Sequence, residues 1–386
     1  MQKIKNLAEA AARIKKAVRD KERIILYGDS DLDGVSSVLV AEQAIRSIGG
    51  SIETFYFPDR EKEGYGITKL ALESFKDLSP ALLIAFDLGI GNIEEVRIAK
   101  DMGFDVIIVD HHIVPDVMPP ADIIVDPKQP GDMYPFKEFA AVGLSYKLAH
   151  EILGKDISDS LKKSIVELAL LGTISDMMPR EEDNIAIIQE GMDAVVDSWR
   201  PGLQAFFEMS EFARIDGREA RVEEIITVLN AREVTNGLPG AFRVLTAPTK
   251  EKAEEVINLL LEQMRQKKEE VWDIVLLMRE RVEQNMSDSV ILEGTDSHDF
   301  YRLGSAASIL TKEYHKPVYL YKKSEKESLG SARAPKGFNT VEAMKSCENL
   351  LEVYGGHPPA SGFRIKNENI EEFKKCLEDY AKKHAE

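Results

Sequence analysis

The sequence has only two cysteines, Cys347 and Cys376, and neither stands in a CxxC or Cys/His pattern. This excludes a disulfide framework and a Cys-ligated zinc site, and we expect both side chains to be reduced thiols without a chemical role. No apolar run approaches the roughly 20 residues needed to span a membrane. Residues 1–21 read as an amphipathic helix without the apolar core of a cleavable signal. We therefore predict a cytoplasmic protein.

Positive charge is also scarce, since 50 Lys and Arg face 67 Asp and Glu, a net charge of −17. Because phosphate attraction is carried by local Lys and Arg, nonspecific adhesion to nucleic acid over the whole surface is excluded. Residues 302–345 differ, with nine Lys and Arg against four Glu, a balance of +5 that leaves −22 for the remainder. This segment is a candidate anion-binding region, and the alternative is a solvated face of mixed charge.

What the sequence does contain is enough apolar residues, 44% of 386, to build two domains. In the first third of the chain, apolar runs alternate with segments of helical period. The runs are RIILYGD, ETFYFPD, ALLIAFDLGI, DVIIVDHH and DIIVD. Runs without polar alternation are typical of strands buried on both faces, so we predict a parallel sheet between helix layers.

Acids and imidazoles follow several of these predicted strands. Asp29, Asp31 and Asp33 alternate in IILYGDSDLDGVSS, and because side chains two apart in an extended segment share a face, we expect them to converge before Gly34 ends the strand. Further candidates are Asp87, Asp110, His111, His112 and, after LALLGTIS, Asp176. The carboxyl ends of parallel strands meet at one edge, so residues distant in sequence become neighbours there.

Carboxylates with one imidazole are what a pair of hard divalent cations requires, and the nitrogen favours Mn²⁺ over Mg²⁺. Two alternatives stay open at this point. The first acidic cluster alone is compatible with a solvated loop, and Asp176 alone with a helix cap.

Four segments in this order, GDSDLDG, FDLGI, VDHH and GTISDMMP, resemble the signature motifs of the DHH phosphoesterase superfamily. PDREKEGYG, VDPKQPGDMYPFKEFAAVGLSYKL, GSARAPKGFN and GGHPPASGFRI narrow the resemblance to its RecJ branch of single-strand-specific exonucleases. The resemblance extends over nearly the whole chain.

The resemblance implies a role for each matching residue. The implied ligands of two metal ions, Mn²⁺ with Mg²⁺ as the alternative, are Asp29, Asp31, Asp33, Asp87, His111 and Asp176, with Asp87 as the bridge. Catalytic roles fall to Asp87, His112 and Asp110, of which Asp110 would orient the imidazoles. The implied substrate contacts are Arg60, Arg232, Ser331, Arg333, Gly355, Gly356 and His357. A surface salt bridge for Arg333 and a simple turn at Gly355 to His357 are the alternatives. Asn230 and Arg232 match their family pattern only in part.

The predicted organisation is an N-terminal parallel-sheet DHH domain, residues 1–248, a connecting helix, 249–285, and a smaller mixed α/β DHH-associated domain, 286–386. The helix has one apolar stripe, from Ala253 to Val282, interrupted by RQKKEE. A partner-binding helix or a short coiled coil is the competing interpretation of that stripe.

By resemblance, we expect a metal-dependent exonuclease that degrades single-stranded DNA from the 5′ end. The sequence stops at Glu386, without the OB-type module of full bacterial RecJ proteins, so we also expect short oligonucleotides as substrates. Repair or replication proteins are possible partners, and no membrane is expected. Two alternatives are a nanoRNase or small-nucleotide (pAp-type) phosphatase of the same superfamily, and a catalytically silent replication scaffold.

Overall fold

The computed structural model describes residues 3–155, 157–231, 233–284 and 289–384. The chain divides into two compact units, Met1–Leu261 and Glu262–Glu386. Within the described residues, no helix is both long enough and apolar enough to cross a membrane.

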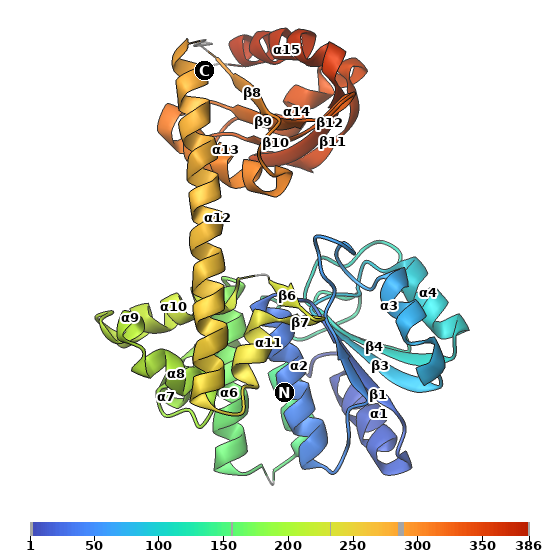
Figure 1. The fold of residues 1–386 in the computed structure, drawn as a ribbon. Coiled ribbons are helices and arrows are strands. Elements are labelled where there is room, and N and C mark those ends of the chain that lie inside the picture. The colour runs from blue at the N-terminus through green and yellow to red at the C-terminus, as the bar shows by residue number, and fades with distance from the viewer. Residues whose placement is uncertain (1–2, 156, 232, 285–288, 385–386) are drawn as a thin grey trace. The chain divides into compact units, whose positions relative to one another are not determined.

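The first unit is built on a five-stranded parallel sheet in the order β2-β1-β3-β4-β5 (Figure 1). Its strands are β1 Ile24–Gly28, β2 Thr54–Tyr56, β3 Ala81–Phe86, β4 Phe104–Val109 and β5 Ile123–Val125. Every residue of β1 and β3 is buried, as the unbroken apolar runs require for strands covered on both faces. The predicted parallel sheet is confirmed.

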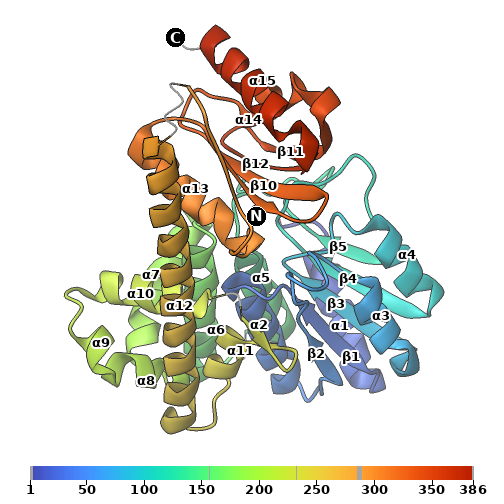
Figure 2. The same cartoon turned by 45° about the horizontal axis from the view of Figure 1, so that its top comes forward.

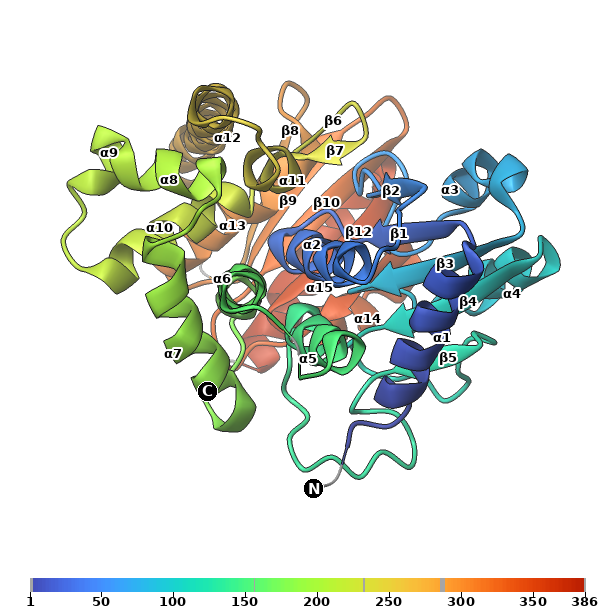
Figure 3. The same ribbon diagram turned by 90° about the horizontal axis from the view of Figure 1, so that it is seen from below.

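Helices cover both faces of this sheet (Figure 3). On one face lie α3 Lys69–Ser74 and α4 Ile93–Asp101, whose apolar residues pack against Ile25, Tyr27 and Leu83. On the other lie α1 Leu7–Asp20, α2 Leu32–Ser47 and α5 Ala141–Leu153. Helix α6, Asp159–Ser175, packs on α2 and α5 and brings its C-terminal end to the carboxyl edge of the sheet.

The remainder of this unit is helical, apart from a two-stranded ribbon. The helices are α7 Glu182–Val196, α8 Pro201–Glu208, α9 Ser210–Ala213, α10 Arg218–Leu229 and α11 Gly240–Leu245, and the ribbon joins β6 Val234–Thr235 to β7 Leu238–Pro239. Helix α12, Lys250–Gln284, contains the border between the two units. Its first half buries Ala253, Ile257 and Leu260, and its second half packs into the second unit. The predicted domain boundaries remain a prediction, and the boundary predicted between residues 285 and 286 lies outside the described residues.

The second unit contains a mixed sheet in the order β11-β12-β10-β9-β8, antiparallel except for the β8–β9 pair. Its strands are β8 Ile291–Thr295, β9 Val318–Lys323, β10 Glu327–Arg333, β11 Leu351–His357 and β12 Ala360–Lys366. Helix α13, Phe300–Tyr314, and the second half of α12 pack on one face; α14 Thr340–Lys345 and α15 Ile370–Lys383 pack on the other (Figure 2).

Two expectations fail in this unit. The helical spacing of TVEAMKSCENLLEV, residues 340–353, predicts a helix to Val353, but residues 351–353 begin β11, because pairing with β12 overrides the helical pattern. The two cysteines were expected to be free, yet Cys347 and Cys376 form a disulfide with a Cα separation of 6.1 Å. The two cysteines are 29 residues apart in sequence, and the packing of α15 beside the α14–β11 connection brings them together. The spacing of the cysteines in the sequence therefore does not predict the bond.

Candidate metal centre

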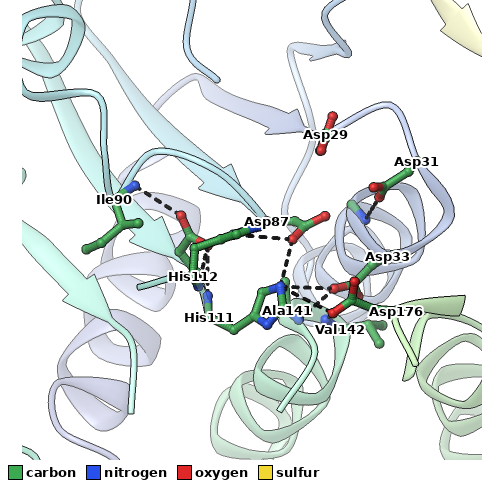
Figure 4. A network of polar contacts seen from close by, with 12 residues as sticks. Asp29, Asp31, Asp33, Asp87, Ile90, His111, His112, Ala141, Val142 and Asp176 are labelled. Atoms are coloured by element: carbon green, nitrogen blue, oxygen red, sulfur yellow. Dashed lines mark hydrogen bonds and ion pairs between the residues drawn. The ribbon is translucent and has the colours of Figure 1, made fainter. Parts of the chain in front are cut away.

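Four chain segments bring the predicted acids and imidazoles to the carboxyl edge of the first sheet (Figure 4). Asp29 follows β1, Asp87 follows β3, and Asp110 to His112 follow β4, while Asp176 is the C-cap of α6. Among the described residues, three groups have ligand atoms within 4.8 Å of one another: Asp29, Asp31 and Asp87; Asp33, His111 and Asp176; and Asp87, His111 and His112. The structure thus assembles the predicted set, while the roles of its members remain predictions.

The first three acids converge differently from the expectation. Strand β1 ends at Gly28, Asp31 is the N-cap of α2 and accepts a hydrogen bond from the Gly34 N–H, and Asp33 lies in the first helical turn. They therefore share no face of an extended segment. The tight turn requires glycine at position 34, since an added Cβ would lie 2.4 Å from the backbone oxygen of Asp29.

Helix α5 fixes the buried carboxylate of Asp33. The N–H groups of Ala141 and Val142, at the start of α5, each donate to one of its oxygens at 2.8 Å, which is a favourable place for a negative charge. Helix α6 approaches equally closely, since a Cβ on Gly172 would lie 2.8 Å from Asp33 Oδ1. Three helices therefore determine the position of this side chain.

His111 lies at the centre of the cluster. Its Nε2 is 3.2 Å from Asp87 Oδ1, 3.5 Å from Asp176 Oδ2 and 3.9 Å from Asp33 Oδ2. Burial, reinforced by the neighbouring His112, lowers the pKa of His111 to about 4, so the ring is neutral at pH 7 and carries a lone pair.

Asp110 and His112 form a separate pair. His112 Nδ1 is 2.8 Å from Asp110 Oδ1, and Asp110 also accepts N–H groups from His111 and Ile90. Burial alone would raise the pKa of Asp110, but these partners outweigh it and lower that pKa. Burial likewise opposes the charged form of His112, yet Asp110 raises the pKa of His112 above its usual value. The orienting role of Asp110 stays a prediction.

At Asp33 and Asp87 burial outweighs any compensation, although Asp33 accepts two backbone N–H groups. Burial raises the pKa of both carboxyls well above the usual range, and the charges of Asp176 and Asp31 add to the effect on Asp33. Crowded carboxylates around a neutral imidazole, without cysteine, form a donor set suited to hard divalent cations, which would offset the repulsion.

Arg60, predicted as a substrate contact, forms ion pairs with two of the acids in this structure. Its Nε is 2.7 Å from Asp29 Oδ1 and its Nη2 is 3.1 Å from Asp31 Oδ2, with a closer contact to Asp29 Oδ2. The guanidinium also lies 4.9 Å from the centre of the Tyr65 ring. The loop that carries PDREKEGYG therefore reaches the metal centre itself.

Sequence reasoning missed three residues around the centre. Tyr65 Oη donates to the Asp87 carbonyl at 3.0 Å and lies 3.3 Å from a nitrogen of His112. Lys128 Nζ donates to the His111 carbonyl at 2.7 Å. Asp126 follows β5 at the same edge and is fully buried, and burial raises the pKa of its carboxyl to about 7. Its position at the end of an apolar run was the available signal.

The remaining predicted site residues lie in several separate segments of the chain. Ser331 and Arg333 lie together near the end of β10, and Arg333 Nη1 donates to Ser331 Oγ at 3.0 Å. Gly355, Gly356 and His357 are exposed at the end of β11 and are not a turn; the turn follows at residues 358–359. Asn230 Oδ1 accepts the Leu32 N–H at 3.3 Å, and Arg232 lies outside the described residues.

Comparison with known families supports the predicted resemblance. Residues 23–173 match the DHH family, N-terminal domain, and residues 288–383 match the DHHA1 domain. The chain contains a DHH domain followed by a DHHA1 domain. The DHH match contains the segments with Asp29, Asp87 and His111, and stops three residues before Asp176.

Similar proteins carry the RecJ name. The single-stranded-DNA-specific exonuclease RecJ of Bacillus subtilis is 33% identical over 98% of this chain, and that of Thermus thermophilus is 30% identical over 98%. These alignments cover 48% and 55% of the two relatives, so this chain spans about half their length. A solved structure described as exonuclease RecJ bound to manganese has a TM-score of 0.80 and 26% identity, and the match covers 98% of this chain and 95% of that one. The chain therefore has a RecJ-like fold.

Proposed function

We propose that this chain is a two-metal-dependent phosphodiesterase that degrades single-stranded DNA from its 5′ end. The observation that carries the proposal is the meeting of acids and imidazoles from four segments in three groups, each within 4.8 Å. The RecJ relatives support the choice of substrate, and the RecJ structure described as bound to manganese supports the choice of Mn²⁺.

Asp87 is the residue best placed to contact two cations, because it lies with Asp29 and Asp31 in one group and with His111 in another. Asp33, His111 and Asp176 would complete the second position. A pair of bound divalent cations would supply an activated water at neutral pH and offset the charge of the scissile phosphate. The chain itself positions the ligands: α5 fixes Asp33, and Tyr65 bonds the Asp87 carbonyl.

His112 is the proposed proton donor to the leaving oxygen. It is exposed, its pKa is raised by Asp110, and it has a ring nitrogen 3.9 Å from Asp87 Oδ1. A charged imidazole held in one orientation by a buried carboxylate has both the proton and the alignment that general acid catalysis needs. Asp110 is then a positioning residue.

Substrate binding is assigned to Ser331, Arg333, Gly355, Gly356 and His357 of the DHHA1 domain and to Arg60. An arginine guanidinium can donate two hydrogen bonds to one phosphate, and exposed glycines let a DNA strand approach the protein backbone closely. The predicted cytoplasmic location and an association with repair or replication proteins belong to this proposal.

The test uses the full chain with Mn²⁺ and strands of two, five and about thirty nucleotides, labelled at either end. We expect the long strand to be shortened from its 5′ end, and Asp87→Ala to be inactive under the same conditions. Preference for the shortest substrates alone would favour the nanoRNase or pAp-type phosphatase. Calorimetry without any Mn²⁺ binding would favour the silent scaffold.

A further inference from the structure

The glycine in the middle of α13, Gly304, stands opposite Arg333. A Cβ built at position 304 would lie 2.8 Å from Arg333 Nη2 and 3.2 Å from Ser331 Oγ. Distances below 3.0 Å essentially never occur for a real Cβ, so the guanidinium occupies the space that any larger side chain would take. Glycine inside a helix costs up to about 1 kcal/mol relative to alanine. The close approach of Arg333 is a reason for glycine at this position.

The guanidinium is fixed on one side and open on another. Its Nη1 donates to Ser331 Oγ at 3.0 Å and to the Ala332 carbonyl at 2.8 Å, and its Nη2 faces Gly304. Among the residues that the structure describes, no carboxylate forms an ion pair with Arg333, although α13 and β10 both carry acids. A half-buried guanidinium without a counter-charge favours an incoming anion.

The surroundings of Arg333 agree with anion binding. The side chain borders a hollow of about 410 Å³ whose lining includes Lys312 and His315 and no acid. Burial lowers the pKa of Arg333, and no neighbouring carboxylate raises it again. Arg13 shows the contrast, since Glu22 and Asp105 raise the pKa of that arginine despite burial.

We propose that Gly304 is a positioning residue for substrate binding: its missing side chain lets the Arg333 guanidinium lie across α13 beside Ser331, in the geometry that holds a phosphate of the DNA strand. This inference rests on the proposed function and adds a residue that makes no contact with the strand itself. The clash in a larger variant falls on the far end of a flexible arginine, so the guanidinium would move and the fold would remain.

The test compares Gly304→Ala with Ser305→Ala, a matched change on the exposed face of the same helix turn. With labelled single-stranded DNA and Mn²⁺, we expect Gly304→Ala to raise KM at least about tenfold, the loss expected for a displaced charge-assisted hydrogen bond. Its kcat should stay within about twofold, since the metal centre lies in the other unit. The melting temperature should be unchanged or higher because alanine favours the helix. Fluorescence anisotropy with the same strand in EDTA should show the same loss of affinity.

A double-mutant cycle identifies the route of the effect. If Gly304 acts through Arg333, Gly304→Ala should add nothing to the defect of Arg333→Ala. The inference is overturned if Gly304→Ala binds like Ser305→Ala, if the two defects add, or if the melting temperature falls together with kcat. If the unmodified protein neither binds nor cuts the DNA strand, the proposed function itself fails. If the unmodified protein is active but the Gly304→Ala results contradict the expectation, only the inference on Gly304 fails.

Discussion

Replacing Asp126 with Asn should make the first unit more stable at alkaline pH. The Asp126 carboxyl is fully buried; its Oδ1 accepts the Lys128 N–H at 2.7 Å, and its Oδ2 has no hydrogen-bond partner among the described residues. Burial, the largest cause, raises its pKa from 3.8 to about 7, and the charge of Asp110 adds to this. The folded state therefore holds the proton more tightly than the unfolded chain.

The size of the effect follows from that shift. Below about pH 4 both states are protonated and ionisation costs nothing, whereas above pH 7 the folded state contains a buried charge. A shift of about three pKa units corresponds to about 4 kcal/mol, and the penalty develops as the pH rises through this window. Between pH 5 and pH 8 the expected change is about 2 to 3 kcal/mol. The Asn amide keeps the bond to Lys128, and its buried NH₂ adds a cost of about 1 to 3 kcal/mol that is independent of pH.

The assay is urea unfolding in EDTA from pH 5 to pH 8. The chain has two tryptophans, so Trp272→Phe leaves Trp199 as the reporter of the first unit. The stability difference between Asp126→Asn and its parent should grow in favour of the variant as the pH rises. Asp116→Asn, which removes an exposed carboxylate, is the control and should run parallel to the parent. Parallel curves for Asp126→Asn would refute the assignment of a buried, protonated carboxyl.

Three further predictions concern other parts of the chain. Asp87→Ala should abolish turnover and remove at least one Mn²⁺ binding event in calorimetry, while the melting temperature is kept because a crowded buried carboxyl is lost; an active variant would contradict the bridging role. Arg200→Met should cost about 3 to 5 kcal/mol in urea unfolding, because Glu167, whose oxygen lies 2.6 Å from Arg200 Nε, would stay buried without its partner. Adding Glu167→Leu should restore most of that loss, and no recovery would show that packing rather than charge was removed. Reduction of the Cys347–Cys376 bond should lower the stability of the second unit by about 3 to 4 kcal/mol for a loop of 29 residues, and Cys376→Ser should make melting insensitive to dithiothreitol; equal sensitivity in both proteins would contradict the bond.

The main candidate ligand set was predictable because two general rules suffice to bring its residues together. Apolar runs indicate buried parallel strands, and the carboxyl ends of such strands meet at one edge. Asp87 and His111 required nothing more. The prediction that Asp31 and Asp33 share one face of an extended segment was wrong, because α2 begins at Leu32 and Asp31 is its N-cap. The alternation of acids in the sequence does not reveal this helix start.

What the sequence could not provide depends on contacts between distant segments. The N–H groups that hold Asp33 come from residues more than a hundred positions later, and Arg60 reaches Asp29 only because its loop folds back over the edge. The disulfide is of the same kind. Residues 351–353 carry a helical pattern, but β12 offers them a partner strand, and the local preference yields.

The carboxylates at the edge of the first sheet differ in how far the protein satisfies their charge. Asp110 is as buried as its neighbours, yet its pKa is lowered because His112 and backbone N–H groups satisfy its charge, and it belongs to none of the candidate ligand groups among the described residues. Burial, the largest cause, raises the pKa of Asp33 and Asp87, nearby negative charges add to it, and both residues belong to candidate ligand groups. A carboxylate whose charge the protein already satisfies gains little from a metal ion, whereas one that the protein leaves uncompensated gains most. We therefore propose Asp33 and Asp87 as cation ligands and Asp110 as the residue that orients His112.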